Sequence, residues 1–208
     1  MRAALVALAL TMAGAPLLSA QEMRDYSVSR QRHGEGRLDA RLDFVAGTIN
    51  VGAGSPDVLY AMQLRYDPDR FEPVSRFDAG DGSLALGIEN AGKSGLRVAS
   101  RAQLTQTASV LLNPAVLVSL EANLGAANAR LELGGLRLSD LHLASGATQA
   151  TISFSQPNRI RCSTMTIEAG AAELLLDRLG NSRCGQVNIT GGMGQMTLDF
   201  RGAWGQPS

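Results

Sequence analysis

Apolar and polar residues alternate in short stretches along the first half of the chain. Residues 38–45 and 58–67 carry an apolar or aromatic residue (leucine, alanine, valine, methionine, tyrosine or phenylalanine) at every second position. This period of two is typical of strands that bury one face and expose the other. Turn residues such as those of DAGDGS, at 78–83, separate the stretches. The pattern predicts strands there, and it indicates a further strand pair, 83–90 with 95–100, about the turn AGKSG.

The second half of the chain repeats itself every 21 to 24 residues. Gly125, Gly146, Gly170 and Gly192 anchor the repeats, and apolar residues stand at the same positions before and after each glycine. The columns before the glycines are Leu120, Leu141, Met165, Val187 and Ala122, Leu143, Ile167, Ile189. The columns after them are Ala129, Ala150, Leu174, Met196 and Leu131, Ile152, Leu176, Leu198.

A repeat of this length with an internal period of two predicts a stack of short strands. One repeat is too small to bury its own apolar face, so neighbouring repeats lie about 4.8 Å apart and place equivalent side chains in rows. The glycines mark corners, where the backbone adopts positive φ or approaches a neighbour closely. The sequence therefore predicts an all-β fold, a β-solenoid-like stack with 21 to 24 residues per repeat.

The repeat is imperfect towards its ends. Gly47 is interpreted as an earlier, degenerate copy of the corner glycine. Eight residues after the corner glycines, Phe154 and Phe200 are predicted to face the interior, whereas Arg178 breaks that column. Trp204 is predicted to cover the last repeat.

Two alternatives to the strand stack are present in the same region. Leu131, Leu136 and Leu141 are five residues apart, as in a pentapeptide-repeat helix, but this spacing ends at Gly146. The segment AAELLLDRLGN, at 171–181, also has the propensity for a short helix. Its apolar columns fit strands better.

Residues 1–20 have the composition of a secretory signal peptide. Arg2 is their only charge, an apolar run follows, and the small residues Ser19 and Ala20 precede the expected cut. An uncleaved membrane anchor is the alternative, although the stretch is slightly short for a span of about 20 apolar residues. We therefore expect an exported protein, periplasmic or extracellular. Its predicted parts are a flexible lead-in at 21–36, an N-terminal β module at 37–110 and a β-repeat domain at 111–204.

The charge of the chain is nearly balanced. Cleavage after residue 20 removes Arg2 from the 19 basic residues and leaves 18 against 19 acidic residues, a net charge of −1. Such a chain offers no basic field to a nucleic acid or an anionic bilayer. We expect no nucleic-acid partner and no stable membrane insertion after signal cleavage.

Cys162 and Cys184 are the only cysteines, and each lies eight residues before its corner glycine. Equivalent positions in adjacent repeats are close enough for a disulfide, which an oxidising compartment favours. A redox or metal-binding pair is the alternative, but the chain has no CxxC motif and only two histidines, His33 and His142. The sequence predicts a structural disulfide.

Residues with catalytic chemistry are few. Both histidines are interpreted as surface residues, and DAGDGS is interpreted as a plain turn because it lacks the later glutamate of a calcium loop. We expect no catalytic, cofactor-binding or metal site. Core packing is the favoured role of Tyr60, Tyr66 and Phe71. The acids considered for a sugar-hydrolysing site, and interpreted as surface charge, are Asp140, Glu168, Glu173, Asp177 and Asp199.

The stretch from Asn113 to Gly202 resembles the toast-rack domains of bacterial envelope proteins. The matching features are the leucines around a Gly-Ala corner, the LGN turn at 179–181 and the closing GGMGQMTLDF at 191–200. Related domains include the C-terminal domain of LiaF-like proteins and domains classed as candidate adhesins. Residues 37–97 are similar to the N-terminal module that precedes such repeats in some members.

The resemblance implies a non-catalytic β-stack used in envelope-stress sensing, regulation or adhesion. LiaF-like members carry transmembrane helices beside the domain, so the resemblance implies an exported relative here. We expect an envelope protein partner or self-association through exposed strand edges. The alternative hypothesis is a carbohydrate-active enzyme on a β-solenoid scaffold, which needs convergent carboxylates or a calcium site.

Overall fold

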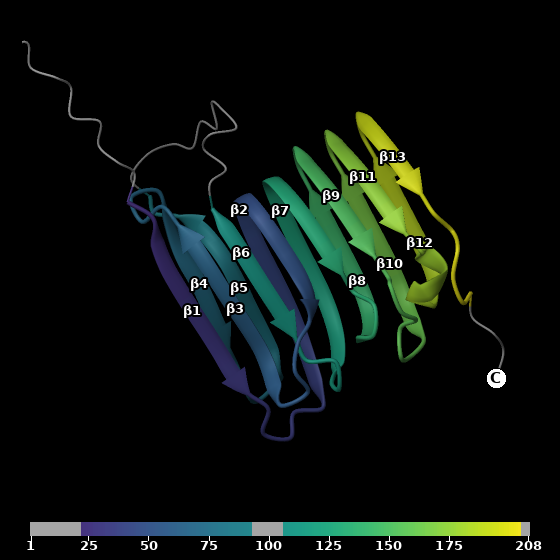
Figure 1. Ribbon diagram of the computed structural model, residues 1–208, viewed down its shortest axis with the longest axis horizontal. Coiled ribbons are helices and arrows are strands. Elements are labelled where there is room, and N and C mark those ends of the chain that lie inside the picture. Colours follow the sequence, from purple (N-terminus) through teal and green to yellow (C-terminus); the bar gives the residue numbers. More distant parts are fainter. Residues whose placement is uncertain (1–21, 93–105, 205–208) are drawn as a thin grey trace, which may run out of the picture.

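The computed structural model of the protein describes residues 22–92 and 106–204. Figure 1 shows its strands side by side along the long axis of the molecule, from β1 at one end to β12 and β13 at the other. The one helical element in these ranges is a short 3₁₀ turn, η2 (Leu179–Ser182). The predicted all-β stack is confirmed.

The strands form two faces joined along a corner, which we call face A and face B. The long strands β2 (Arg37–Ala53) and β7 (Leu117–Glu132) cross the corner and belong to both faces. Face A also contains β4 (Phe71–Phe77), β5 (Ser83–Asn90), β8 (Arg137–Ser145), β10 (Cys162–Ala169) and β12 (Cys184–Gly191). Face B also contains β1 (Arg24–Gln31), β3 (Val58–Tyr66), β6 (Thr107–Leu112), β9 (Thr148–Ser153), β11 (Ala172–Asp177) and β13 (Gly194–Leu198).

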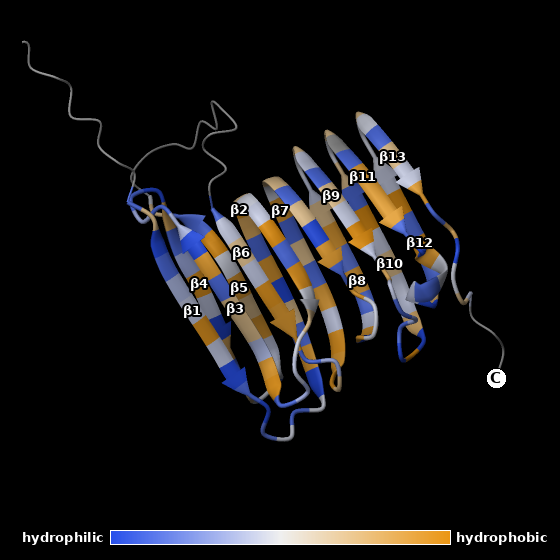
Figure 2. Ribbon diagram, viewed as in Figure 1, coloured by the Kyte–Doolittle hydropathy of each residue, from blue (hydrophilic) through white to orange (hydrophobic). Residues whose placement is uncertain are grey.

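One strand of face A and the following strand of face B make one rung, and parallel pairing joins successive rungs. All four predicted apolar columns are in register from β7 to the last rung, β12 with β13. Leu131, Ile152 and Leu176 are fully buried between the faces. Figure 2 shows the resulting alternation of apolar and polar positions along the strands. The interior therefore consists of rows of equivalent side chains.

The predicted N-terminal module and the repeats share this interior. β2 pairs with β7 in register from Arg37 with Leu117 to Val51 with Leu131. A single cluster of buried apolar residues extends from Leu38 to β11 and η2. β2 is therefore a rung of the same stack.

The corner glycines are required for close approach of adjacent rungs. A Cβ on Gly125 would lie 2.3 Å from the carbonyl oxygen of Val45, and one on Gly192 would lie 2.9 Å from that of Gly170. Positive φ, the other predicted reason, does not apply to these residues. The interpretation of Gly47 is wrong in register, because Gly47 pairs with Ala127 and Val45 is the residue opposite Gly125.

A row of buried asparagines occupies the opposite corner. Asn113, Asn158 and Asn181 are at most 8 % exposed. The Asn158 side chain accepts a hydrogen bond from the Leu138 N–H (2.9 Å) and donates one to the Leu138 carbonyl (2.7 Å). Asn181 donates to the Phe154 carbonyl in the same manner, at 2.9 Å. These amides satisfy backbone groups where the chain leaves one rung for the next.

The expected flexible lead-in is wrong for residues 24–31, which form strand β1 and pair antiparallel with β3. Tyr26 and Val28 pack partly against the core, while the neighbouring Asp25, Ser27 and Ser29 are exposed. An edge strand buries little surface and needs few apolar residues. The alternation in β1 is therefore limited to a few positions within a polar segment, and it did not indicate a strand.

The predicted pairing of residues 83–90 is also different in the structure. β5 pairs with β4 on one edge and with β2 on the other. The expected partner strand, 95–100, lies outside the described residues. The DAGDGS segment is the turn between β4 and β5, as predicted, with the Gly80 N–H donating to Asp78 at 2.7 Å.

Segment 171–181 contains strand β11 followed by η2, so the helix alternative is wrong for its strand part. Arg178, the misfit of its column, has a positive φ of 54° and begins the 3₁₀ turn. Arg178 therefore lies where the backbone changes direction, and an apolar side chain facing the interior is not needed at this position.

Glu132 ties two rungs together at the end of β7. Its carboxylate accepts hydrogen bonds from the Gly134 N–H (2.9 Å), the Ser155 N–H (3.0 Å) and the hydroxyls of Ser153 (2.8 Å) and Ser155 (2.9 Å). Partial burial raises the pKa of Glu132, but these hydrogen bonds together outweigh it and lower the pKa below its ordinary value of 4.5.

Replacing Glu132 by glutamine lowers the free energy of unfolding by about 1–3 kcal/mol at neutral pH, because a neutral amide cannot accept all four bonds. Because the pKa of Glu132 is lower in the folded state, its ionised form stabilises the fold at pH values above the unfolded-state pKa. This stabilisation is lost as the pH falls through the folded-state pKa. The difference between wild type and Glu132→Gln in urea unfolding therefore shrinks between pH 7 and pH 3. An exposed control, Glu72→Gln on β4, changes stability by less than about 0.5 kcal/mol. A difference for Glu132→Gln that is independent of pH would contradict this.

Candidate functional site

The two ends of the stack differ in the chemistry of their outermost strands. At the first end, β1 carries Arg24, Asp25 and Arg30, and β4 carries Pro73 between charged residues. Charges and proline on an edge strand hinder the addition of another strand. This end is therefore protected against strand pairing.

At the other end, β12 and β13 lack such protection. Their sequences, CGQVNITG and GQMTL, contain no charged residue and no proline. Within residues 22–92 and 106–204, no strand pairs with the outer edge of either one. These edges offer two rows of backbone N–H and C=O groups to an added strand.

The apolar columns are also uncovered at this end. Met196 is 38 % exposed, whereas Leu174, its partner on the preceding rung, is 2 % exposed. Ile189 is only partly buried, and with Met196 and Leu174 it lines a hollow of about 250 Å³ beside the glycine corner. Met193, in the turn between β12 and β13, is 82 % exposed at the rim of this hollow. We call β12, β13 and this turn the open end.

The segment after β13 does not cover the open end. Residues 199–201 bond instead to the η2 turn, where the Leu179 N–H donates to the Asp199 carbonyl (2.8 Å). Phe200 is 54 % exposed, so its predicted interior position is wrong. Trp204 lies against Gly180 of that turn and stacks on Phe200, with ring centroids 6.1 Å apart. Trp204 thus covers the η2 turn that leads into the last rung, but it leaves the edges of β12 and β13 unpaired.

A disulfide joins the open end to the rung before it. Cys162 of β10 and Cys184 of β12 are in register and are bonded, with their Cα atoms 4.1 Å apart. Cys162 is buried, and no free cysteine is present in the described part of the chain. The last rung, which has a neighbour on one side only, is thus held covalently.

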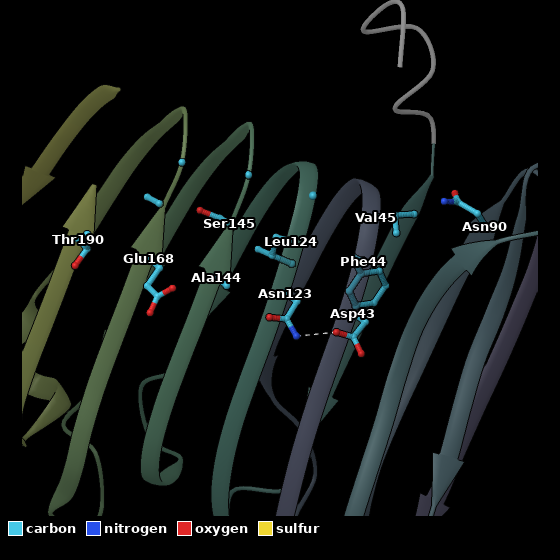
Figure 3. Close-up of a pocket in the computed structure, with 14 residues that line it drawn as sticks. Asp43, Phe44, Val45, Asn90, Asn123, Leu124, Ala144, Ser145, Glu168 and Thr190 are labelled. Carbon is cyan, nitrogen blue, oxygen red and sulfur yellow. Dashed lines mark hydrogen bonds between the residues drawn. The ribbon is translucent and has the colours of Figure 1, made fainter. Parts of the chain in front are cut away.

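A larger groove, of about 850 Å³, follows the glycine corner on face A (Figure 3). Asp43, one of its lining residues, accepts hydrogen bonds from Asn123 (2.7 Å) and Arg41 (2.8 Å), and Arg41 also pairs with Glu121 at 2.8 Å. These polar groups satisfy one another across two rungs. The groove is therefore a weaker candidate than the open end.

The acids considered for sugar hydrolysis are divided between the two outer faces. Asp177 and Asp199 are the adjacent pair, and Arg201 lies within 4.0 Å of the first and 2.7 Å of the second. Hydrogen bonds from Arg201 lower the pKa of Asp199 far below its ordinary value. Face A carries Asp140 and Glu168, whereas face B carries Glu173, with Asp177 and Asp199 at or beyond its strand ends.

The other residues considered for chemistry lie apart. His33 is exposed in the turn between β1 and β2, and His142 is half-buried on the outside of face A. Tyr60, Tyr66 and Phe71 are buried in the core, as favoured. Across the described ranges, no three histidine, cysteine or acidic side chains gather where they could hold a metal ion.

Comparison with known families agrees with this architecture. The family model for the N-terminal domain of toast_rack, DUF2154, matches residues 19–177, which is more than half of the chain. The chain belongs to this toast-rack family. The match includes β2 and most of the repeats, and it begins well before the stretch in which the sequence resemblance was strongest. A sequence comparison with curated proteins finds no match.

The structure is also similar to solved structures. A candidate cell adhesion protein from Clostridium sporogenes superposes with a TM-score of 0.69 at 17 % identity, over 85 % of this chain and 98 % of that chain. A candidate adhesin from Parabacteroides merdae gives a TM-score of 0.35 at 10 % identity, over 84 % and 80 % of the two chains. The first of these likenesses supports the fold.

In the described part of the chain, no helix has the length and apolar character needed to cross a bilayer. The predicted signal peptide, 1–20, lies outside the described residues.

Proposed function

We propose that this toast-rack protein is a non-catalytic, exported component of the cell envelope that binds a protein partner through its open end. The observation that carries the proposal is the pair of uncharged, proline-free edges of β12 and β13. A partner strand on either edge gains main-chain hydrogen bonds, and apolar side chains gain burial against Ile189 and Met196.

The compartment is supported by two features. A disulfide such as Cys162–Cys184 persists in oxidising compartments and is rare in the cytosol. The composition of residues 1–20 matches a secretory signal. A binding role also agrees with the structural relative from Clostridium sporogenes, which is described as a candidate cell adhesion protein.

A photo-activated cross-linking residue at Gln195 of β13 tests the proposal in cells. Gln63 of β3 is the matched control, because it is an exposed glutamine on the same face near the protected end. We expect a covalent adduct from position 195 and none from position 63. The Met196→Lys substitution, which places a charge in the end hollow, should abolish the adduct. Equal labelling from both positions, or none from 195, would refute the proposal.

A further inference from the structure

We infer that the partner of the open end is a second copy of this chain, bound end to end about a two-fold axis. This inference rests on the proposed function and specifies its partner. The first argument is charge. From Cys184 to Leu198 the chain has no charged residue, so two open ends approach each other without like-charge repulsion.

The second argument is strand direction. β12 runs towards the glycine corner and β13 runs away from it, as do the strands of the preceding rungs with which they pair in parallel. A two-fold axis parallel to the strands therefore sets β12 of one copy beside β13 of the other, antiparallel. The β12 and β13 edges of both copies become paired at once, and no free edge remains where the two open ends meet. The assembly closes as a dimer.

The third argument is shape. The same axis brings the glycine corners of the two copies together. Met193, 82 % exposed at that corner, then faces the hollow of the other copy, between Leu174, Ile189 and Met196. The contact is reciprocal, with an apolar side chain and an apolar hollow on each copy. Methionine suits such a contact because its flexible thioether adapts to irregular space.

The protected end of a second copy is a poorer occupant. It would present Arg24, Asp25 and Arg30 of β1, or Pro73 of β4, to the uncharged edges. Such a head-to-tail contact would leave charges without partners and would continue into a filament. The structure therefore favours the closed dimer over a chain of copies.

Light scattering coupled to size-exclusion chromatography of the mature, disulfide-bonded protein tests the inference. We expect the mass of a dimer for wild type. Met196→Lys should raise the dissociation constant at least about tenfold, because the hollow would have to bury a charge. Leu175→Lys is the matched control, since Leu175 is 39 % exposed on the outside of β11, one rung from the end. It should remain dimeric.

Circular dichroism and thermal unfolding show whether each variant is folded. If Met196→Lys does not fold, Met193→Lys replaces it, because Met193 is so exposed that its loss leaves the monomer intact. A monomeric wild type, filaments, or a dimer unaffected by these substitutions would overturn the inference. A monomeric wild type whose position 195 cross-links to a different protein would overturn it and leave the proposed function standing. Absence of any adduct would refute both.

Discussion

Replacing Asn158 by alanine lowers the free energy of unfolding by about 2–6 kcal/mol, because two buried backbone groups each lose a partner. The side-chain amide of Asn158 pairs with both the N–H and the C=O of Leu138 on β8. Asn158 precedes β10, which begins at Cys162 and pairs with β8. The side-chain amide therefore makes the two hydrogen bonds to Leu138 that a backbone peptide group of β10 would make if the strand began earlier. Asn158 and Leu138 are both fully buried, so water cannot substitute.

Urea unfolding of Asn158→Ala measures this loss. The control is Asn188→Ala on β12, where the side chain is exposed and accepts one bond from Gln186. We expect the control to change stability by less than about 0.5 kcal/mol. Equal stability of the two variants would mean that the asparagine row is not needed to join the rungs.

Removing the disulfide with Cys162→Ala and Cys184→Ala costs about 3 kcal/mol, mainly by releasing a constraint on the unfolded chain. The two cysteines are 22 residues apart, and the bond links the last rung to its only neighbour. For a protein of this size, the corresponding fall in melting temperature is about 6–12 °C. In a stack stabilised by nearest-neighbour contacts, the last rung should open first.

Thermal unfolding measures the loss of overall stability, and hydrogen exchange measures the opening of the last rung. We expect faster amide exchange in β12 and β13 of the double variant, with β7 and β8 unchanged. Wild type treated with a reducing agent should behave like the variant. Unchanged melting temperatures in both would show that strand pairing alone holds the last rung.

The repeat made the register of the stack predictable from sequence. Equivalent residues such as Leu131, Ile152 and Leu176 must face the same interior, so their spacing determined which residues are neighbours. The same spacing located the cysteine pair. β1 was missed because a strand that buries only part of one face leaves a weak pattern, whereas the LGN turn named at 179–181 coincides with η2.

The candidate site was harder to predict. Strand edges were expected to bind, but sequence alone does not show which strands are outermost. The signal was present in the 15 residues from Cys184 to Leu198, which contain no charge, in contrast to the outward positions of earlier strands. The asparagine row had a signal too, since Asn158 and Asn181 are 23 residues apart, close to the repeat length. Its meaning depended on knowing that these side chains are buried.

The in-register pairing of the rungs has a consequence for the length of the molecule. Because each rung contacts only the rungs beside it, a segment such as 147–170 is one structural repeat, and a second copy of it could be inserted beside the first. Duplicating such a unit would move the protected end and the open end apart by about 4.8 Å, with the outermost strands of both ends unchanged. The number of rungs therefore sets the distance between the two ends of the molecule.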